Sequence, residues 1–177
     1  AGMERRGKRN PGRNARNGDH SGHGDAGEGM IRPRYETSEH LANEQRVADF
    51  LSEAWNCEFI KLNPVKWKVD FLVRSLGFEE KFSWAEVKCL NMNFGRFPFM
   101  ISYKKIEAAK QLHDTSGKKF LLIFRCLDDL CYHVWDFNRE YKFEYSGRTT
   151  ATRDSQDVEP IFRVYPDQCV KVKGFWG

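Results

Sequence analysis

The sequence predicts an α/β domain with a mixed central sheet flanked by helices, and three observations favour this fold class. Segments with helical spacing and strand-like runs follow one another in the order helix, three strands, helix, two strands. The strand-like runs end at turn residues such as Gly, Pro and Asn. The chain has 177 residues, which is enough for one domain with a sizeable core.

The first half of the expected fold contains one helix and three strands. The helix covers residues 38–55, with Ser38 at its N-cap and apolar residues at helical spacing. The strands cover residues 57–62, 65–73 and 82–90. Their two-residue period and the turn signals between them predict a meander.

The second half begins with a loop at residues 91–99 and a helix at residues 102–113, which stops at Ser116-Gly117. The most apolar run, residues 119–126, is expected in the centre of the sheet, and another strand covers residues 130–137. Short C-terminal strands are expected on either side of a polar loop at 146–159, and they cover residues 141–145, 160–165 and 169–173.

The positive charge of the chain is concentrated at its N-terminus. Residues 1–34 are rich in Gly, Arg and Asn and are expected to be disordered, whereas residues 35–177 are expected to form the folded domain. The folded part holds 21 of the 29 basic and 21 of the 25 acidic residues, so the net charge of +4 belongs to the tail. Such a tail either contacts nucleic-acid phosphates or serves only to solubilise the chain.

The sequence lacks the signals of a membrane or secreted protein. No apolar run approaches the roughly 18 residues of a membrane span, and no apolar signal segment is visible. The five cysteines form no Cys-x-x-Cys motif, and the histidines do not fall at zinc-ligand spacing to them. Free thiols in a reducing compartment are therefore expected, and with them a cytoplasmic location.

Two acidic residues and a lysine stand out in the second and third strand-like runs, as Asp70 and as Glu86-Val87-Lys88. Side chains alternate between the two faces of a strand, which places these residues opposite the apolar sets. The apolar sets are Val69, Phe71 and Val73 in the first run and Ala85, Val87 and Cys89 in the second. If the two strands pair, Asp70, Glu86 and Lys88 converge.

This grouping has the composition of a site for metal-assisted phosphodiester hydrolysis. Two carboxylates within about 4–6 Å repel each other, and a hard cation such as Mg²⁺ removes that penalty. The alternative is a solvated strand face with an ion pair, for which Glu-x-Lys is also typical. Asp70 fits that alternative less well, because Asp is depleted in strands.

The motif and its position among the elements resemble the PD-(D/E)xK nuclease superfamily, which has the restriction-endonuclease-like fold. The resemblance covers roughly residues 38–136, with Asp70 on the second strand and Glu86-Val87-Lys88 on the third. Val69 stands where the family often has Pro. By the same resemblance, Glu44 on the first helix faces the site, and the second helix offers contacts to phosphates. The candidates for those contacts are Tyr103, Lys104 and Gln111.

The resemblance also implies a mechanism and a cofactor. Asp70, Glu86, the carbonyl of Val87 and Glu44 are the expected ligands of Mg²⁺ or Mn²⁺. The metal is expected to polarise the scissile phosphate and to lower the pKa of a bound water. Lys88 is expected to orient that water and to stabilise the negative charge that develops in the transition state.

The sequence therefore predicts a metal-dependent nuclease that cuts DNA, as an endonuclease with a phage, repair or restriction role. Arg96, with Phe94 and Phe97 beside it, is a further candidate contact to nucleic acid. A homodimer is compatible with cutting two strands, although no dimerisation signal is visible. The competing hypotheses are a non-catalytic binding module on the same fold, and an RNA-binding protein whose basic tail does the binding.

Overall fold

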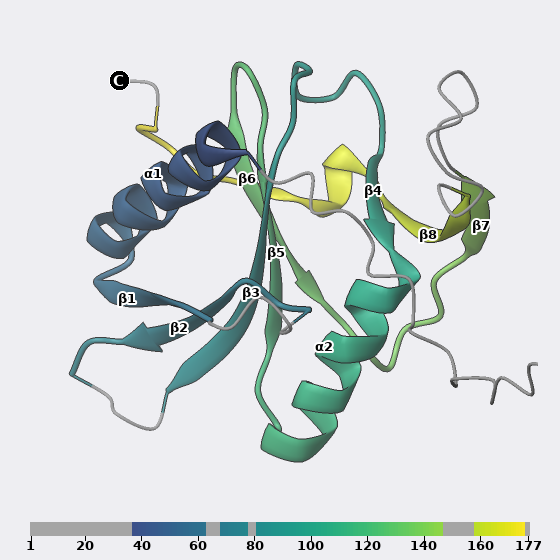
Figure 1. Ribbon diagram of the computed structural model, residues 1–177, viewed down its shortest axis with the longest axis horizontal. Coiled ribbons are helices and arrows are strands. Elements are labelled where there is room, and N and C mark those ends of the chain that lie inside the picture. The colour runs from purple at the N-terminus through teal and green to yellow at the C-terminus, as the bar shows by residue number, and fades with distance from the viewer. Residues whose placement is uncertain (1–36, 63–67, 78–80, 147–157, 176–177) are drawn as a thin grey trace, which may run out of the picture. The chain divides into compact units, whose positions relative to one another are not determined.

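A mixed sheet lies at the centre of the fold, with the strand order β1-β2-β3-β5-β6-β9 (Figure 1). The computed structural model describes residues 37–62, 68–77, 81–146 and 158–175. The predicted N-terminal tail and much of the polar loop at 146–159 lie outside these residues. The strands of this sheet are β1 (Cys57–Lys61), β2 (Phe71–Ser75), β3 (Phe82–Cys89), β5 (Phe120–Arg125), β6 (Leu130–Trp135) and β9 (Val170–Lys171).

The topology of this sheet confirms the central predictions. Strands β1, β2 and β3 form an antiparallel meander. Strand β5 then pairs in parallel with β3 and antiparallel with β6, so the most apolar run lies between two partners in the middle of the sheet. The parallel pair is joined by a crossover that contains a helix, as parallel pairing requires.

A second sheet was not predicted as a separate unit. It contains β4 (Phe99–Ser102), β8 (Glu159–Val164) and β7 (Phe143–Ser146), in that order. The sequence predicts a loop up to residue 99 and a helix from residue 102, so β4 was not expected. The strand is only four residues long, but Phe99 and Ile101 are buried while Met100 is exposed, which is the alternation of a half-buried strand.

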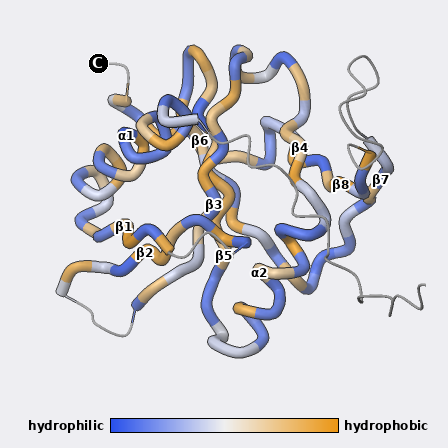
Figure 2. The backbone as a smooth tube through the Cα atoms, viewed as in Figure 1, coloured by the Kyte–Doolittle hydropathy of each residue, from blue (hydrophilic) through white to orange (hydrophobic). Residues whose placement is uncertain are grey.

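The two faces of the large sheet have different covers. Helix α1 (Ser38–Ala54) packs against one face through Val47, Ala48 and Leu51. Helix α2 (Tyr103–Ser116) and the small sheet pack against the other face. Hydrophobic residues are concentrated in the central strands, whereas both helices alternate hydrophobic and hydrophilic positions (Figure 2). Side chains of β5 point alternately to the two faces of the sheet, so this strand contributes to both hydrophobic cores. Toward α1 it contributes Ile123, and toward α2 it contributes Phe120, Leu122 and Phe124.

The predicted strand at residues 65–73 needs correction. Strand β2 begins at Phe71 and continues to Ser75, and Asp70 lies immediately before it. Val69 therefore does not share a face with Phe71 and Val73. It packs in the cluster beneath α2, whereas Phe71 and Val73 pack beneath α1. A bend at residues 68–69 breaks the two-residue period, and residues 63–67 lie outside the described part of the chain.

The helix ends follow ordinary capping chemistry. The N-cap of α1 is Thr37 rather than Ser38, and its hydroxyl accepts a hydrogen bond from the backbone N–H of His40 at 3.2 Å. Helix α2 continues to Ser116 and ends at Gly117, whose φ of 67° lies in the left-handed region that glycine adopts without strain. Among the described residues, neither helix is long and apolar enough to cross a membrane.

Candidate active site

Glu86 and Lys88 project from the same face of β3, because side chains two residues apart in a strand point to the same side. Trp84 on this face packs against the core beneath α2, whereas Ala85 and Val87 belong to the core beneath α1. The prediction that Glu86 and Lys88 lie on the opposite face of the strand from Ala85 and Val87 is therefore confirmed. Glu86 is buried, with 7% of the residue exposed.

Asp70 is anchored where β2 meets β3. The pairing of β2 with β3 ends where Phe71 lies opposite Ala85, so β2 offers no backbone partner to the N–H of Val87. The Asp70 side chain is the acceptor instead: its Oδ2 accepts a hydrogen bond from the N–H of Val87, at 3.1 Å. The N–H and C=O of one residue in a strand point to the same edge, so the carbonyl of Val87 also points toward the edge that Asp70 occupies.

Lys105 from α2 joins the two acidic side chains. Its Nζ lies 2.7 Å from Oε1 of Glu86 and 3.4 Å from Oδ1 of Asp70. About a third of the Lys105 side chain is exposed, but both carboxylates are more deeply buried. The structure therefore brings together the two acids that the sequence singled out, with an ammonium group between them.

Burial governs the electrostatics of this cluster. It raises the pKa of Glu86 to about 8, and the negative charge of Asp70 adds to the effect while Lys105 opposes it. Burial also disfavours the charge on Lys105, but the attraction of Glu86 and Asp70 outweighs it and raises the pKa of that lysine. Burial lowers the pKa of Lys88, against the attraction of Glu86.

Lys88 does not contact the two carboxylates directly. Its Nζ donates a hydrogen bond to the backbone carbonyl of Met100 in β4, at 2.5 Å. Met100 belongs to β4, the strand that was not predicted. Ser102 at the end of the same strand donates a hydrogen bond to Glu159 of β8, at 2.9 Å. The small sheet thus supplies the partner that orients the motif lysine.

Glu44 lies on α1 but is not placed beside the other two acids. Its Oε2 accepts a hydrogen bond from Nζ of Lys61, at 2.7 Å. Among the described residues, no group of three or more His, Cys, Asp or Glu side chains is placed to hold a metal ion. The structure therefore unites Asp70 and Glu86 without bringing Glu44 to them as a third ligand.

The two basic candidates for DNA contact are exposed. Lys104 lies on the first turn of α2, one residue before Lys105. Arg96 lies in the loop between β3 and β4, with its guanidinium 5.3 Å from the centre of the Phe97 ring. Both side chains are accessible to a nucleic-acid backbone.

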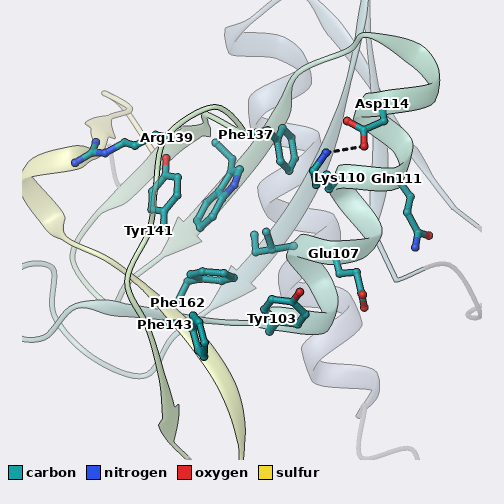
Figure 3. A pocket seen from close by; sticks show the side chains of 12 residues that line it. Tyr103, Glu107, Lys110, Gln111, Asp114, Phe137, Arg139, Tyr141, Phe143 and Phe162 are labelled. Atoms are coloured by element: carbon teal, nitrogen blue, oxygen red, sulfur yellow. Dashed lines mark hydrogen bonds and ion pairs between the residues drawn. The ribbon is translucent and has the colours of Figure 1, made fainter.

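Tyr103 and Gln111 line a separate pocket of about 420 Å³ on another flank of α2 (Figure 3). Successive helix residues are rotated by about 100°, so Tyr103 and Lys105 project from nearly opposite flanks. The pocket is lined by aromatic rings, and Tyr103 stacks against Phe162 with ring centres 5.8 Å apart. An ion pair between Lys110 and Asp114 lies at its rim.

The donor set at Asp70 and Glu86 fits a hard divalent cation. Mg²⁺ is usually bound by one or two carboxylates, with waters and substrate phosphates completing its shell. Here one Asp and one Glu carboxylate are buried beside each other, with a backbone carbonyl on the same edge. The ammonium of Lys105 already lies between the carboxylates, which shows that the space between them accommodates positive charge.

The sequence makes Lys104 and Lys105 alike candidates for phosphate contact, although the helical spacing distinguishes them. Ala109 and Leu112 follow Lys105 by four and seven residues, the spacing of one helix face. That face carries apolar side chains and packs on the sheet, so Lys105 faces inward. Lys104 lies one position away and projects to solvent.

The fold and the site together define a class of protein, the nucleases with a restriction-endonuclease-like core and a PD-(D/E)xK motif. Residues 30–171 match the family described as "Phage putative PDDEXK endonuclease". The match covers most of the chain, which therefore belongs to this family. The predicted superfamily is confirmed, and the chain is a nuclease domain.

Comparison with individual proteins gives a likeness among the solved structures. No sequence among the curated proteins matches the chain. Among solved structures, Hjc, a Holliday junction resolvase from the archaeal hyperthermophile Archaeoglobus fulgidus, is similar to it with 14% sequence identity and a TM-score of 0.47. That similarity covers 74% of this chain and 90% of the resolvase.

Proposed function

We propose that the protein is a metal-dependent endonuclease that hydrolyses phosphodiester bonds in DNA, with Asp70 and Glu86 as metal ligands and Lys88 as the catalytic lysine. One observation carries this proposal: Asp70, immediately before β2, and Glu86, on the neighbouring strand β3, are held around a single positive charge. Family membership supports the reaction type. An ion pair on a solvated strand face, the simpler explanation of the motif, does not suit a glutamate that is 7% exposed.

Each side chain has a distinct task in this proposal. Asp70 is fixed by the N–H of Val87 and offers its remaining oxygen to the cation. Glu86 offers its carboxylate from the central strand, and the carbonyl of Val87 completes the protein ligands. A divalent cation held there would polarise the scissile phosphate and make a bound water more acidic.

Lys88 acts on the substrate rather than on the metal. It projects from the same face as Glu86, and its ammonium group is held by the carbonyl of Met100. A positive charge fixed beside the reacting phosphate stabilises the negative charge that grows in the transition state. The hydrogen bond to Met100 keeps the side chain directed without neutralising its charge.

The DNA contacts extend the same proposal beyond the catalytic centre. Arg96 and Lys104 are exposed and would contact the backbone near the cut, and the basic residues before 35 would add sequence-independent affinity. A homodimer would supply two sites for cutting two strands. The five cysteines are free thiols, which suits the reducing cytoplasm of a host cell.

The test is cleavage of plasmid and oligonucleotide DNA by the pure full-length protein with Mg²⁺, with Mn²⁺ and with EDTA. We expect cutting with either metal and none with EDTA. Glu86→Gln should lose at least about a hundredfold in rate while keeping its fold, because it removes a ligand charge. Glu107→Gln is the matched control, since Glu107 lies on the pocket flank of α2.

The outcome separates the nuclease from a binding module on the same fold. Protein that binds DNA but never cuts it with any divalent metal would support the binding module and overturn the proposal. Equal rates for the wild type and Glu86→Gln would overturn the assignment of the site.

A further inference from the structure

The ammonium of Lys105 is held where the proposed metal ligands converge. It contacts both oxygens of Glu86, at 2.7 and 2.8 Å, and one oxygen of Asp70, at 3.4 Å. A lysine that served only to stabilise a helix surface needs one carboxylate and no burial. Lys110 on the same helix has that arrangement, with its single partner Asp114 four residues along and more than half of each side chain exposed.

A divalent cation and the Lys105 ammonium compete for the same negative charge. The two carboxylates carry at most two negative charges, which a divalent cation neutralises by itself. An ammonium that stayed within hydrogen-bond distance of both carboxylates would then face the metal at a few ångströms. At a given distance, the repulsion between an ammonium and a divalent cation is twice that between two unit charges.

The lysine is the part of the cluster that is free to move. Asp70 is fixed by the N–H of Val87, and Glu86 projects from a strand that is paired on both sides. Lys105 reaches the carboxylates through a four-carbon stem from the first turn of α2, and about a third of its side chain is exposed. Rotation of that stem releases the ammonium without disturbing the sheet.

We propose that Lys105 is an internal counter-cation, which occupies the metal site in the metal-free protein and is displaced when a divalent cation binds Asp70 and Glu86. The inference rests on the proposed metal site. It assigns Lys105 a positioning role: the lysine holds the two carboxylates together until the metal replaces it. The released ammonium then lies beside the site, where a DNA phosphate is its natural partner.

Chemical labelling of the wild-type protein tests the displacement directly. The full chain is treated with an amine-acetylating reagent with and without Mg²⁺, and the modification of each lysine is measured by mass spectrometry. We expect labelling of Lys105 to rise several-fold with Mg²⁺, because the ion pairs that protect it are lost. Lys104 and Lys110 are internal controls, and their labelling should not change. Unchanged labelling of Lys105 in protein that binds Mg²⁺ by calorimetry, where Glu86→Gln abolishes that binding, would overturn the proposal.

Metal affinity of the Lys105→Gln variant gives a second, independent readout. Removing the competing charge should tighten Mn²⁺ binding by about tenfold, whereas Lys104→Gln should change it by less than about twofold because its charge is solvated. Equal Mn²⁺ affinity of the wild type and Lys105→Gln would show that the metal does not displace Lys105, although the proposed metal site would remain supported. If neither protein bound Mn²⁺, the proposed metal site would fail and the displacement with it.

Discussion

The two flanks of α2 carry similar residues in very different surroundings. On one flank, Lys105 bridges two buried carboxylates of the large sheet. On the other flank, Lys110 pairs with Asp114 at the rim of an aromatic pocket, where both side chains are more than half exposed. Each of the two lysines pairs with an aspartate, so residue type alone does not make a site.

Burial is what separates the two flanks. An exposed ion pair gains little, because water already solvates both charges. Two buried carboxylates destabilise the fold unless a cation lies beside them, because water no longer solvates their charges. The comparison therefore predicts large effects for changes on the Lys105 flank and small effects for the matching changes on the Lys110 flank.

The largest difference is expected in DNA cleavage. Asp70→Asn should reduce the cleavage rate by about a hundredfold to a thousandfold, because it removes a ligand charge from the proposed metal site. Asp114→Asn, the matching change on the other flank, should leave the rate within about twofold. Rates of supercoiled plasmid cleavage with Mg²⁺ measure both. Similar losses in the two variants would remove the distinction between the flanks.

The next largest effect is expected in the pH dependence of metal binding. The pKa of Glu86 is raised to about 8 in the metal-free protein, so at lower pH the metal must displace a proton. Mn²⁺ affinity should therefore rise by about tenfold or more between pH 6 and 8 and level off above that range. Calorimetry in buffers of different ionisation enthalpy would count the released proton. An affinity that is constant over this range would contradict the pKa assignment.

The stability of the metal-free protein should show the opposite trend. The folded pKa of Glu86 lies above the unfolded value of 4.5, so between these values the folded protein holds a proton that the unfolded chain has lost. Its contribution to stability is therefore present below pH 4.5 and is lost as pH rises through about 8. Urea unfolding in EDTA measures this slope, and Glu86→Gln should flatten it.

A smaller effect is expected from the two lysines on the free energy of unfolding without metal. Lys105→Met should cost about 1–2 kcal/mol, because it leaves two buried carboxylates without an ammonium partner. Lys110→Met should cost no more than about 0.5 kcal/mol, as an exposed pair four residues apart in a helix does. Denaturant unfolding in EDTA measures both. Adding Glu86→Gln to Lys105→Met should recover part of the loss, and a failure to recover would argue against charge as the cause.

The smallest effect is expected for DNA binding through the pocket flank. Lys104→Ala should weaken DNA affinity several-fold and reduce its salt dependence, whereas Gln111→Ala should weaken it by less than about twofold. Fluorescence anisotropy with a labelled oligonucleotide in Ca²⁺, at several salt concentrations, compares the two. A large loss for Gln111→Ala would extend the DNA interface around α2 to the aromatic pocket.

The sequence was sufficient to predict the central sheet and the pair of acids. The meander, the central position of the most apolar strand and the opposite faces of Glu86 and Val87 all follow from hydrophobic period. Asp70 was singled out because Asp is depleted in strands, and the structure places it immediately before β2 rather than within it. These features depend on local pattern, which a single sequence carries.

Features that depend on distant partners were missed. Strand β4 is four residues long and is defined by its pairing with β8, about sixty residues away. Val69 was assigned to the wrong face because a bend before β2 interrupts the period. Glu44 pairs with Lys61, which is seventeen residues away and carries no motif signal. The inward orientation of Lys105 could have been predicted, because its spacing to Ala109 and Leu112 places all three on one face of the helix.

A crystal structure of the protein soaked with Mn²⁺ would show whether the metal displaces Lys105, because anomalous scattering locates the ion. We expect a peak between the carboxylates of Asp70 and Glu86, with the Lys105 ammonium moved away from both. A structure in which Mn²⁺ binds elsewhere while Lys105 still bridges the two carboxylates would contradict this expectation.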